Sequence, residues 1–296
     1  MEAIGNTPIV RLSRVFPNAN VVAKLEFMNP GGSIKDRMVR YMLSHMPNGI
    51  GSVVESSSGN TGAALAMAGA VLGLECTVTV PDTTSNEKIK RIAAYGARVH
   101  VCETGAGAGV GPDYQALARD LATESGAYCL DQYSSHRNRE AHYVDTGPEL
   151  WKQMQGEIDI FVCGIGSGGT ISGIGRFLKE RNPNLRVIGV EPLRSAYRKL
   201  VTDQPSEGNY STVLEGVGKR EPSGSFDPAM VDDVVQVGDE EALAWMRRLA
   251  QEEGILAGGS SGCVAAGINR LLPKLGDMRV VTVFPDSGAF YLSKLF

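Results

Sequence analysis

Residues 52–69 read SVVESSSGNTGAALAMAG, and this stretch decides the fold class. A short apolar, β-branched run meets a turn of serine, glycine and asparagine, and an alanine-rich run follows at once. The first run is typical of a buried strand and the second of a helix, while glycine and serine favour the turn between them. Residues 52–69 therefore predict a strand–turn–helix unit of an α/β fold.

The same alternation of strand-like and helix-like stretches continues along the chain on both sides of this unit. The strand-like runs are short, mainly apolar and β-branched, and continuous apolar strands indicate burial on both faces and a mostly parallel sheet. We expect strands at 20–27, 52–56, 76–80, 98–102, 127–131, 158–165, 186–191, 231–237 and 278–285. We expect helices within 60–73, 85–95, 113–125, 139–155, 169–181, 239–253 and 261–272.

Composition excludes several classes of function. The chain has 296 residues and a formal net charge of −4, so it has no basic excess with which to bind nucleic acid generally. Its five cysteines are odd in number and far apart, which argues against a disulfide framework or a zinc site. No apolar run approaches the roughly 18 residues of a membrane span, and no signal peptide opens the chain. We expect a cytoplasmic protein without membrane partners.

The segment NPGGSIKDR at residues 29–37 places a lysine behind two glycines and a serine. Glycine lets the backbone approach a ligand closely, and Ser33 favours a helix start, so we expect Lys35 in the first turn of a helix. The helix dipole disfavours a cation there, which lowers the pKa of an amine. Lys35 is therefore a candidate nucleophile or base, with an ordinary surface lysine as the alternative.

Two turns between a strand and a helix are candidate anion sites. Backbone N–H groups at a helix start lack partners within the helix and point beyond the carboxyl end of the preceding strand. At 57–61 these groups are joined by hydroxyls and an amide, which predicts a carboxylate cradle. At 166–170 successive glycines predict a phosphate cradle. An ordinary capped turn is the alternative in each case.

The second turn also fits another class of enzyme. Gly164, Gly166 and Gly169 match the pattern G-x-G-x-x-G, which keeps a nicotinamide-dependent dehydrogenase as an alternative. Ser287 follows the last expected strand, at the carboxyl end where ligands of parallel sheets bind. A lysine, a carboxylate cradle, a phosphate cradle and a hydroxyl together indicate a pyridoxal 5′-phosphate site.

Ordered motifs along nearly the whole chain resemble those of the cysteine synthase and cystathionine β-synthase family of pyridoxal-phosphate enzymes. The resemblance implies the fold type II architecture shared with the tryptophan synthase β subunit: two open, mostly parallel twisted sheets with helices on both faces. It also implies a smaller mobile domain at 36–132, which closes on the substrate, and a larger cofactor-binding domain formed by 1–35 and 133–296. The motifs are GNTPIVRL (5–12), AKLEFMNPGGSIKDR (23–37), SSGNTG (57–62), AHYVDTGPELW (141–151), GSGGTISG (166–173), EGILAGGSSG (253–262) and FPDSG (284–288).

The resemblance also implies roles for individual residues. Lys35 would form the Schiff base with the cofactor and later move protons. Asn60 would contact the cofactor's ring hydroxyl, and Ser287 its pyridine nitrogen. The phosphate would be held by Gly166, Ser167, Gly168, Gly169 and Thr170, and the substrate carboxylate by Ser57, Ser58, Gly59, Thr61 and Gln132. No metal is implied.

The implied activity is β-replacement on an O-activated L-serine through an aminoacrylate, with a small nucleophile as second substrate and a homodimer as the assembly. The alternatives are a relative that adds an amine to make a 2,3-diaminopropionate precursor, a cystathionine β-synthase-like use of homocysteine, and a catalytically idle homologue that binds a partner. The leaving group stays open between acetate, phosphate and another group, and the nucleophile between sulfide, a thiol and an amine. Arg137, Arg139, Lys219 and Arg220 are candidates to contact a phosphate leaving group, with a solvated basic turn as the alternative.

Overall fold

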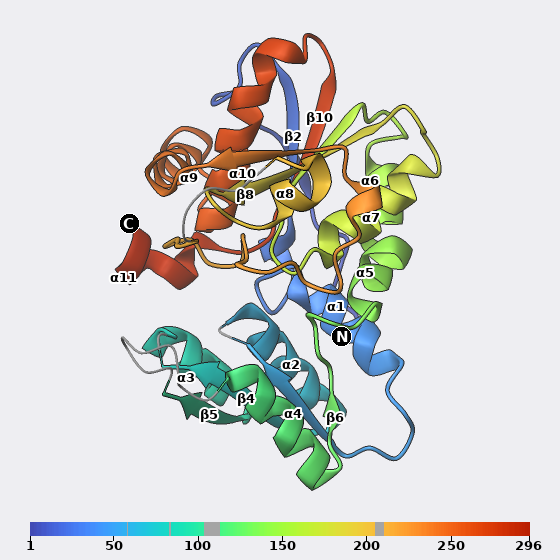
Figure 1. Ribbon diagram of the computed structural model, residues 1–296, viewed down its shortest axis with the longest axis vertical. Helices are drawn as coiled ribbons and strands as arrows, with labels where there is room; N and C mark the ends of the chain where they lie inside the picture. The colour runs from blue at the N-terminus through green and yellow to red at the C-terminus, as the bar shows by residue number, and fades with distance from the viewer. Residues whose placement is uncertain (58, 83, 104–112, 205–209) are drawn as a thin grey trace.

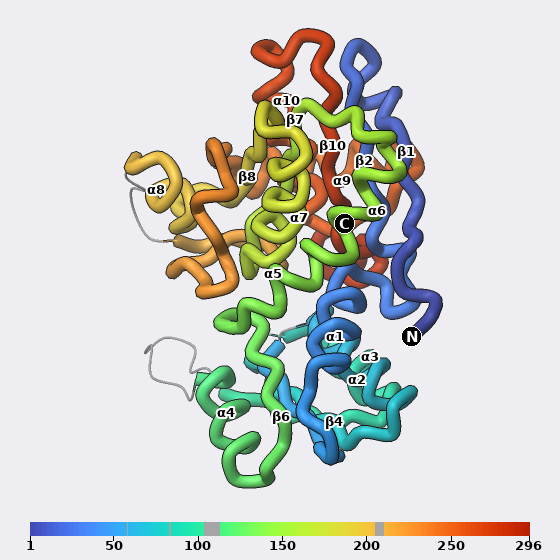
Figure 2. The backbone as a smooth tube through the Cα atoms, turned by 90° about the vertical axis from the view of Figure 1, so that its right-hand side faces the viewer, coloured from blue at the N-terminus to red at the C-terminus, as the bar shows by residue number. Residues whose placement is uncertain are grey.

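The computed structural model describes residues 1–57, 59–82, 84–103, 113–204 and 210–296, and its backbone forms two lobes (Figure 1). Ser58, predicted to hold the substrate carboxylate, lies outside the described residues. Figure 2 shows the two connections between the lobes: the chain enters the small lobe through α1 (Lys35–Ser44) and returns along the segment that leads to α5 (Arg137–Ala141).

The large lobe is built on a six-stranded sheet in the order β1-β2-β10-β7-β8-β9. Every pair of neighbours is parallel except β1 and β2, which are antiparallel. The two central strands are apolar and almost fully buried, as expected for strands covered on both faces. The strands are β1 (Ile9–Arg11), β2 (Asn20–Leu25), β7 (Ile160–Gly164), β8 (Arg186–Pro192), β9 (Asp233–Val237) and β10 (Arg279–Phe284).

Helices cover both faces of this sheet. On one face α9 (Asp239–Glu253) and α10 (Gly259–Leu271) pack against the strands through residues such as Leu249 and Val264. On the other face α6 (Gly147–Gln153) and α7 (Gly169–Lys179) pack through Leu150 and Ile174. The lobe also contains α8 (Tyr197–Thr202), α11 (Leu292–Leu295) and the 3₁₀ turns Glu26–Met28, Pro228–Met230, Leu272–Lys274 and Gly288–Tyr291.

The small lobe is built on a four-stranded, fully parallel sheet in the order β5-β4-β3-β6. Helices α1, α2 (Asn60–Leu72) and α3 (Asn86–Ala94) share one apolar core with this sheet. Helix α4 (Tyr114–Ser125) packs on Val54 from a separate apolar cluster. The strands are β3 (Ser52–Ser56), β4 (Glu75–Pro81), β5 (Arg98–Cys102) and β6 (Tyr128–Cys129).

The predicted fold class is confirmed: two mostly parallel sheets carry helices on both faces. Three short elements were not predicted, namely β1, α8 and α11, because so few residues carry too weak a periodic signal. The expected helix at 139–155 is interrupted by a π-helical turn at His142–Thr146 between α5 and α6. All five cysteines are unpaired, as expected, and only Cys129 is not fully buried. Of the helices that the structure describes, none is long and apolar enough to cross a membrane.

Candidate active site

Lys35 is the first residue of α1, at the junction of the two lobes. The hydroxyl of Ser33 accepts a hydrogen bond from the Lys35 backbone N–H at 3.3 Å, in keeping with the predicted helix start. Burial lowers the pKa of the Lys35 amine to about 8, although Glu55 and Asp286 oppose this shift. The predicted direction is therefore correct, but the cause is loss of solvent around the amine rather than the helix dipole.

The side chain of Lys35 lies between two adjoining cavities. The narrower one is bounded by the turn after β7, and the wider one, the cleft, encloses about 270 Å³ between the lobes. Both cavities are lined by Lys35, Gly166, Ser167 and Gly216. A molecule that fills both would therefore pass directly beside the lysine amine.

The turn of the narrower cavity requires glycine at three positions. Gly168 has a φ of +85°, and a Cβ on Gly166 would lie 2.2 Å from the backbone oxygen of Gly216. A Cβ on Gly169 would lie 2.0 Å from the Oδ1 atom of Asn138. This closely packed turn lines the narrower cavity and leads into the start of α7, where a helix favours an anion.

The polar groups around this turn are neutral. Ser167 accepts a hydrogen bond from Asn138 Nδ2 at 3.0 Å, and Thr170 Oγ1 lies 3.2 Å from Nε2 of His142. His142 is fully buried, and burial keeps its pKa well below the ordinary value, so the ring is uncharged. Among the described residues that line the narrower cavity there is no carboxylate. This donor set fits a phosphate group.

The cleft brings together the predicted substrate residues that the structure describes. Ser57, Gly59, Thr61 and Gln132 all line it together with Lys35. Thr61 Oγ1 donates to Gln132 Oε1 at 2.8 Å, so the Gln132 amide nitrogen is turned towards Glu55, 3.2 Å away. The carboxylate cradle is thus a connected hydrogen-bond network at the start of α2.

Asn60 also lines the cleft, and its partner was not expected. Its Nδ2 donates to Oδ2 of Asp286 at 2.6 Å, and the hydroxyl of Tyr291 donates to the same oxygen. Asp286, the residue before Ser287, therefore orients a predicted cofactor residue. Ser287 accepts a hydrogen bond from the Ala289 backbone at 3.2 Å and is absent from the described lining of both cavities.

Several residues at the cleft carried no local sequence signal. Lys88 of α3 forms an ion pair with Glu215 of the large lobe, and its ammonium lies 4.4 Å from the centre of the Tyr291 ring. This pair joins residues 127 positions apart, so no spacing rule predicts it. Tyr133, which directly follows Gln132, lines the cleft as well.

The four basic residues predicted as candidates to contact a phosphate leaving group do not all lie at the cavities. Lys219 lines the cleft, whereas Arg137, Arg139 and Arg220 are not among the described residues that line either cavity. Arg137 donates instead to the hydroxyl of Tyr128 at 2.7 Å, and Arg139 lies 3.7 Å from Asp227. The hypothesis that these residues contact a phosphate leaving group therefore has structural support only at Lys219.

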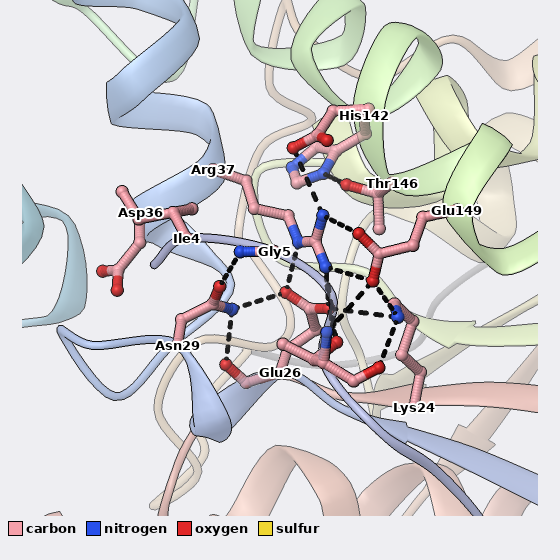
Figure 3. A network of polar contacts seen from close by, with 12 residues as sticks. Ile4, Gly5, Lys24, Glu26, Asn29, Asp36, Arg37, His142, Thr146 and Glu149 are labelled. Carbon is pink, nitrogen blue, oxygen red and sulfur yellow. Dashed lines mark hydrogen bonds and ion pairs between the residues drawn. The ribbon is translucent and has the colours of Figure 1, made fainter. Parts of the chain in front are cut away.

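Behind Lys35, on the side away from the cleft, α1 is anchored by a set of buried charges that we call the buried ion cluster: Lys24, Glu26, Arg37 and Glu149. Arg37 is buried between the two carboxylates, with Nε 2.7 Å from Glu26 Oε2 and Nη2 2.9 Å from Glu149 Oε1 (Figure 3). Lys24 pairs with Glu149 and donates to the Thr7 backbone oxygen at 3.0 Å. Figure 3 shows Asp36 directed away from this cluster. The cluster joins α1 to β2 and α6, and so fixes the base of the helix that carries Lys35.

A half-buried amine of lowered pKa beside the predicted phosphate and carboxylate cradles is what an enzyme that uses pyridoxal 5′-phosphate requires. The chain belongs to the family described as pyridoxal-phosphate dependent enzyme, whose model matches residues 1–286. The resemblance drawn from the sequence motifs and the cofactor prediction are both confirmed.

Known relatives extend over nearly the whole chain. It is 40% identical to a cysteine synthase of Aquifex aeolicus and 37% identical to one of Staphylococcus aureus; each alignment covers 99% of this chain, and 90% and 94% of those proteins. It is 38% identical to a cystathionine beta-synthase of Apis mellifera, of which it spans only 60%. A crystal structure of O-ureido-L-serine synthase is similar at a TM-score of 0.89 and 32% identity, covering 99% of this chain and 92% of that one.

Proposed function

We propose that the protein catalyses pyridoxal-phosphate-dependent β-replacement on an O-activated L-serine. One observation carries the proposal: Lys35 lies between a cavity suited to phosphate and a cleft lined by the predicted carboxylate residues. The cysteine synthases and the O-ureido-L-serine synthase support this reaction over the alternatives weighed from the sequence.

The residues of the chain divide the work of this reaction. The bound cofactor supplies an electron sink for the negative charge that develops at the substrate Cα. Gly166 to Thr170 would hold its phosphate, and Asn60, held by Asp286, would contact its ring hydroxyl. The Lys35 amine takes the proton from the substrate Cα and later returns one, and a pKa near 8 keeps both protonation states accessible at neutral pH.

The substrate carboxylate is bound by the cradle at 57–61 together with Gln132. Glu55 lies directly behind Gln132, and burial raises the pKa of its carboxyl group to about 8. Glu55 is therefore mostly protonated at pH 7 and does not repel the incoming carboxylate. Because the cradle lies in the small lobe and the phosphate site in the large one, a closing movement of domain 36–132 would exclude water from the reacting atoms. The Lys88–Glu215 pair spans the two lobes at the cleft.

Mass spectrometry of the products tests the proposal. The holoenzyme is incubated with O-acetyl- or O-phospho-L-serine and with sulfide, a thiol or an amine, and the visible absorption of the bound cofactor is followed. We expect an absorption change with the activated serine alone and a β-substituted alanine once a nucleophile is added. A yellow holoenzyme that shows neither change with any activated serine would contradict the proposal.

We also infer that the protein acts as a homodimer in the cytoplasm on a small amino acid and a small nucleophile, without nucleic-acid or membrane partners. The bacterial relatives of similar length support the class of reactants. Light scattering coupled to gel filtration measures the assembly directly.

A further inference from the structure

Lys219 is held rigidly at the wall of the cleft. Its backbone N–H donates to the Ser195 hydroxyl at 3.0 Å, and its backbone oxygen accepts from the Ala196 N–H at 3.0 Å. The preceding Gly218 donates to the Ile165 backbone oxygen at 2.7 Å, next to the phosphate turn. Both neighbouring peptide groups are therefore anchored to the large lobe, and the Lys219 side chain starts from a fixed position.

The Lys219 side chain lies among the substrate residues. It lines the cleft together with Thr61 and Gln132, and it is absent from the described lining of the narrower phosphate cavity. Its ammonium lies 3.4 Å from the centre of the Tyr133 ring, and Tyr133 directly follows Gln132 in the chain. Burial keeps the pKa of Tyr133 well above its ordinary value, so this phenol is neutral and does not compensate the ammonium charge.

Apart from Lys35, the other ionisable groups at the cleft are already paired or neutral. Lys88 is paired with Glu215, whose second oxygen lies 2.9 Å from Lys294. Glu55 is mostly protonated at pH 7. Within the ranges that the structure describes, Lys219 has no carboxylate in ion-pair distance, and its ammonium packs on the Tyr133 ring.

A half-buried cation without an anionic partner favours a ligand that brings one. The α-carboxylate of an amino-acid substrate is accounted for by the cradle at 57–61, and the Lys35 amine by the cofactor. We propose that Lys219 is a specificity-determining residue that binds a second anionic group, a phosphate or carboxylate, carried by one of the two reactants. This inference rests on the proposed function. The group belongs either to the leaving group on the serine or to the incoming nucleophile.

Matched charge removals on the holoenzyme test the proposal. Lys219→Met keeps the apolar stem and removes the ammonium, while Arg220→Met removes a positive charge from the exposed next residue. KM is compared for O-phospho- and O-acetyl-L-serine with sulfide, and then, with O-acetyl-L-serine, for 3-mercaptopropionate and the uncharged 2-mercaptoethanol. The same variants are titrated with each activated serine by the visible absorption of the cofactor, which reports binding without turnover.

We expect Lys219→Met to raise KM about tenfold or more for the anionic member of one pair only, because it removes one charge-assisted contact. Lys219→Arg should bring KM for that anionic substrate most of the way back to the wild-type value. Arg220→Met should change the ratio of the two KM values within each pair less than about twofold. If Lys219→Met raises KM for O-phosphoserine, the anionic group belongs to the leaving group. If it raises KM for 3-mercaptopropionate, the anionic group belongs to the nucleophile.

Two results would overturn the inference. One is an unchanged preference in both pairs. The other is a cofactor affinity that falls by the same factor as activity, which would place Lys219 on the cofactor phosphate. A wild-type enzyme inactive on every activated serine would instead refute the proposed function, so the two failures are distinguishable.

Discussion

Lys35 and Arg37 lie two positions apart on α1, yet they face opposite kinds of environment. Arg37 is in the buried ion cluster, where each cation contacts a carboxylate and the formal charges of Lys24, Glu26, Arg37 and Glu149 cancel. Lys35 faces the cleft, where its amine has no ion-pair partner among the described residues. Both regions are buried, so burial alone does not separate structure from function.

The difference appears in the direction of the pKa shifts. In the cluster, burial works to raise the pKa of Glu149, but hydrogen bonds from Arg37 and Lys24 overcome it and hold the value at about 2. In the cleft, burial dominates and moves the pKa values of Lys35, Glu55 and Lys219 to about 8. Groups that titrate near neutral pH can exchange protons, whereas fully paired charges hold elements together.

Replacing Lys35 should have the largest effect on activity. Lys35→Ala removes both the nucleophile and the base, so we expect turnover to fall at least about 10³-fold while the melting temperature changes little. The visible absorption that reports covalent attachment of the cofactor should be lost as well. A variant that stays yellow and turns over would show that the proton is moved by another group.

Replacing Arg37 should reduce stability strongly and activity much less, the reverse of what we expect for Lys35. Arg37→Met leaves the buried carboxylates of Glu26 and Glu149 facing each other without their common partner, which typically costs about 3–5 kcal/mol. We expect urea denaturation to show this loss, with kcat reduced far less than in Lys35→Ala at a temperature where the variant is folded.

Arg40 provides the matched control for that experiment. It is one turn further along α1, contacts Asp145 at 2.7 Å and has a side chain that is 31% exposed. Arg40→Met should cost about 1 kcal/mol or less, because a solvated pair contributes little. If Arg37→Met abolished activity without loss of stability, the separation between the two faces of α1 would be wrong.

The sequence predicted what depends on neighbouring residues. The strands at 52–56 and 98–102 match the structure residue for residue, because each is a short run built around two valines with turn-favouring glycines close by in the chain. The placement of Lys35 at the start of a helix and the glycine turn at 166–170 were also readable locally. Partners far apart in the sequence could not be predicted. Asn60 and Asp286 are 226 positions apart, Lys88 and Glu215 are 127 positions apart, and only the fold brings each pair together.

The cleft and the buried ion cluster should also differ in how their carboxyl groups, Glu55 and Glu149, make stability depend on pH. The folded-state pKa of Glu55 is raised to about 8 from an ordinary 4.5, so its contribution to stability is fully present below pH 4.5 and is lost as the pH rises through 8. Glu149 has the opposite sign: its pKa is depressed to about 2, so its contribution is present above pH 4.5 and is lost on acidification towards 2. Of these two carboxyl groups, only Glu55 titrates between pH 5 and 8.

Glu55→Gln keeps the oxygen that accepts from Gln132 and removes the titration. We therefore expect the free energy of unfolding of this variant, relative to wild type, to rise by roughly 2–4 kcal/mol between pH 5 and pH 8, since one pKa unit corresponds to about 1.4 kcal/mol. Glu149→Gln should be destabilised by a constant amount over the same range, because Glu149 stays ionised throughout. Urea denaturation of the cofactor-free protein at several pH values measures both. Parallel curves for Glu55→Gln and wild type would mean that Glu55 is ionised at pH 5, and its carboxylate would then compensate Lys35 as completely as Glu149 compensates Arg37.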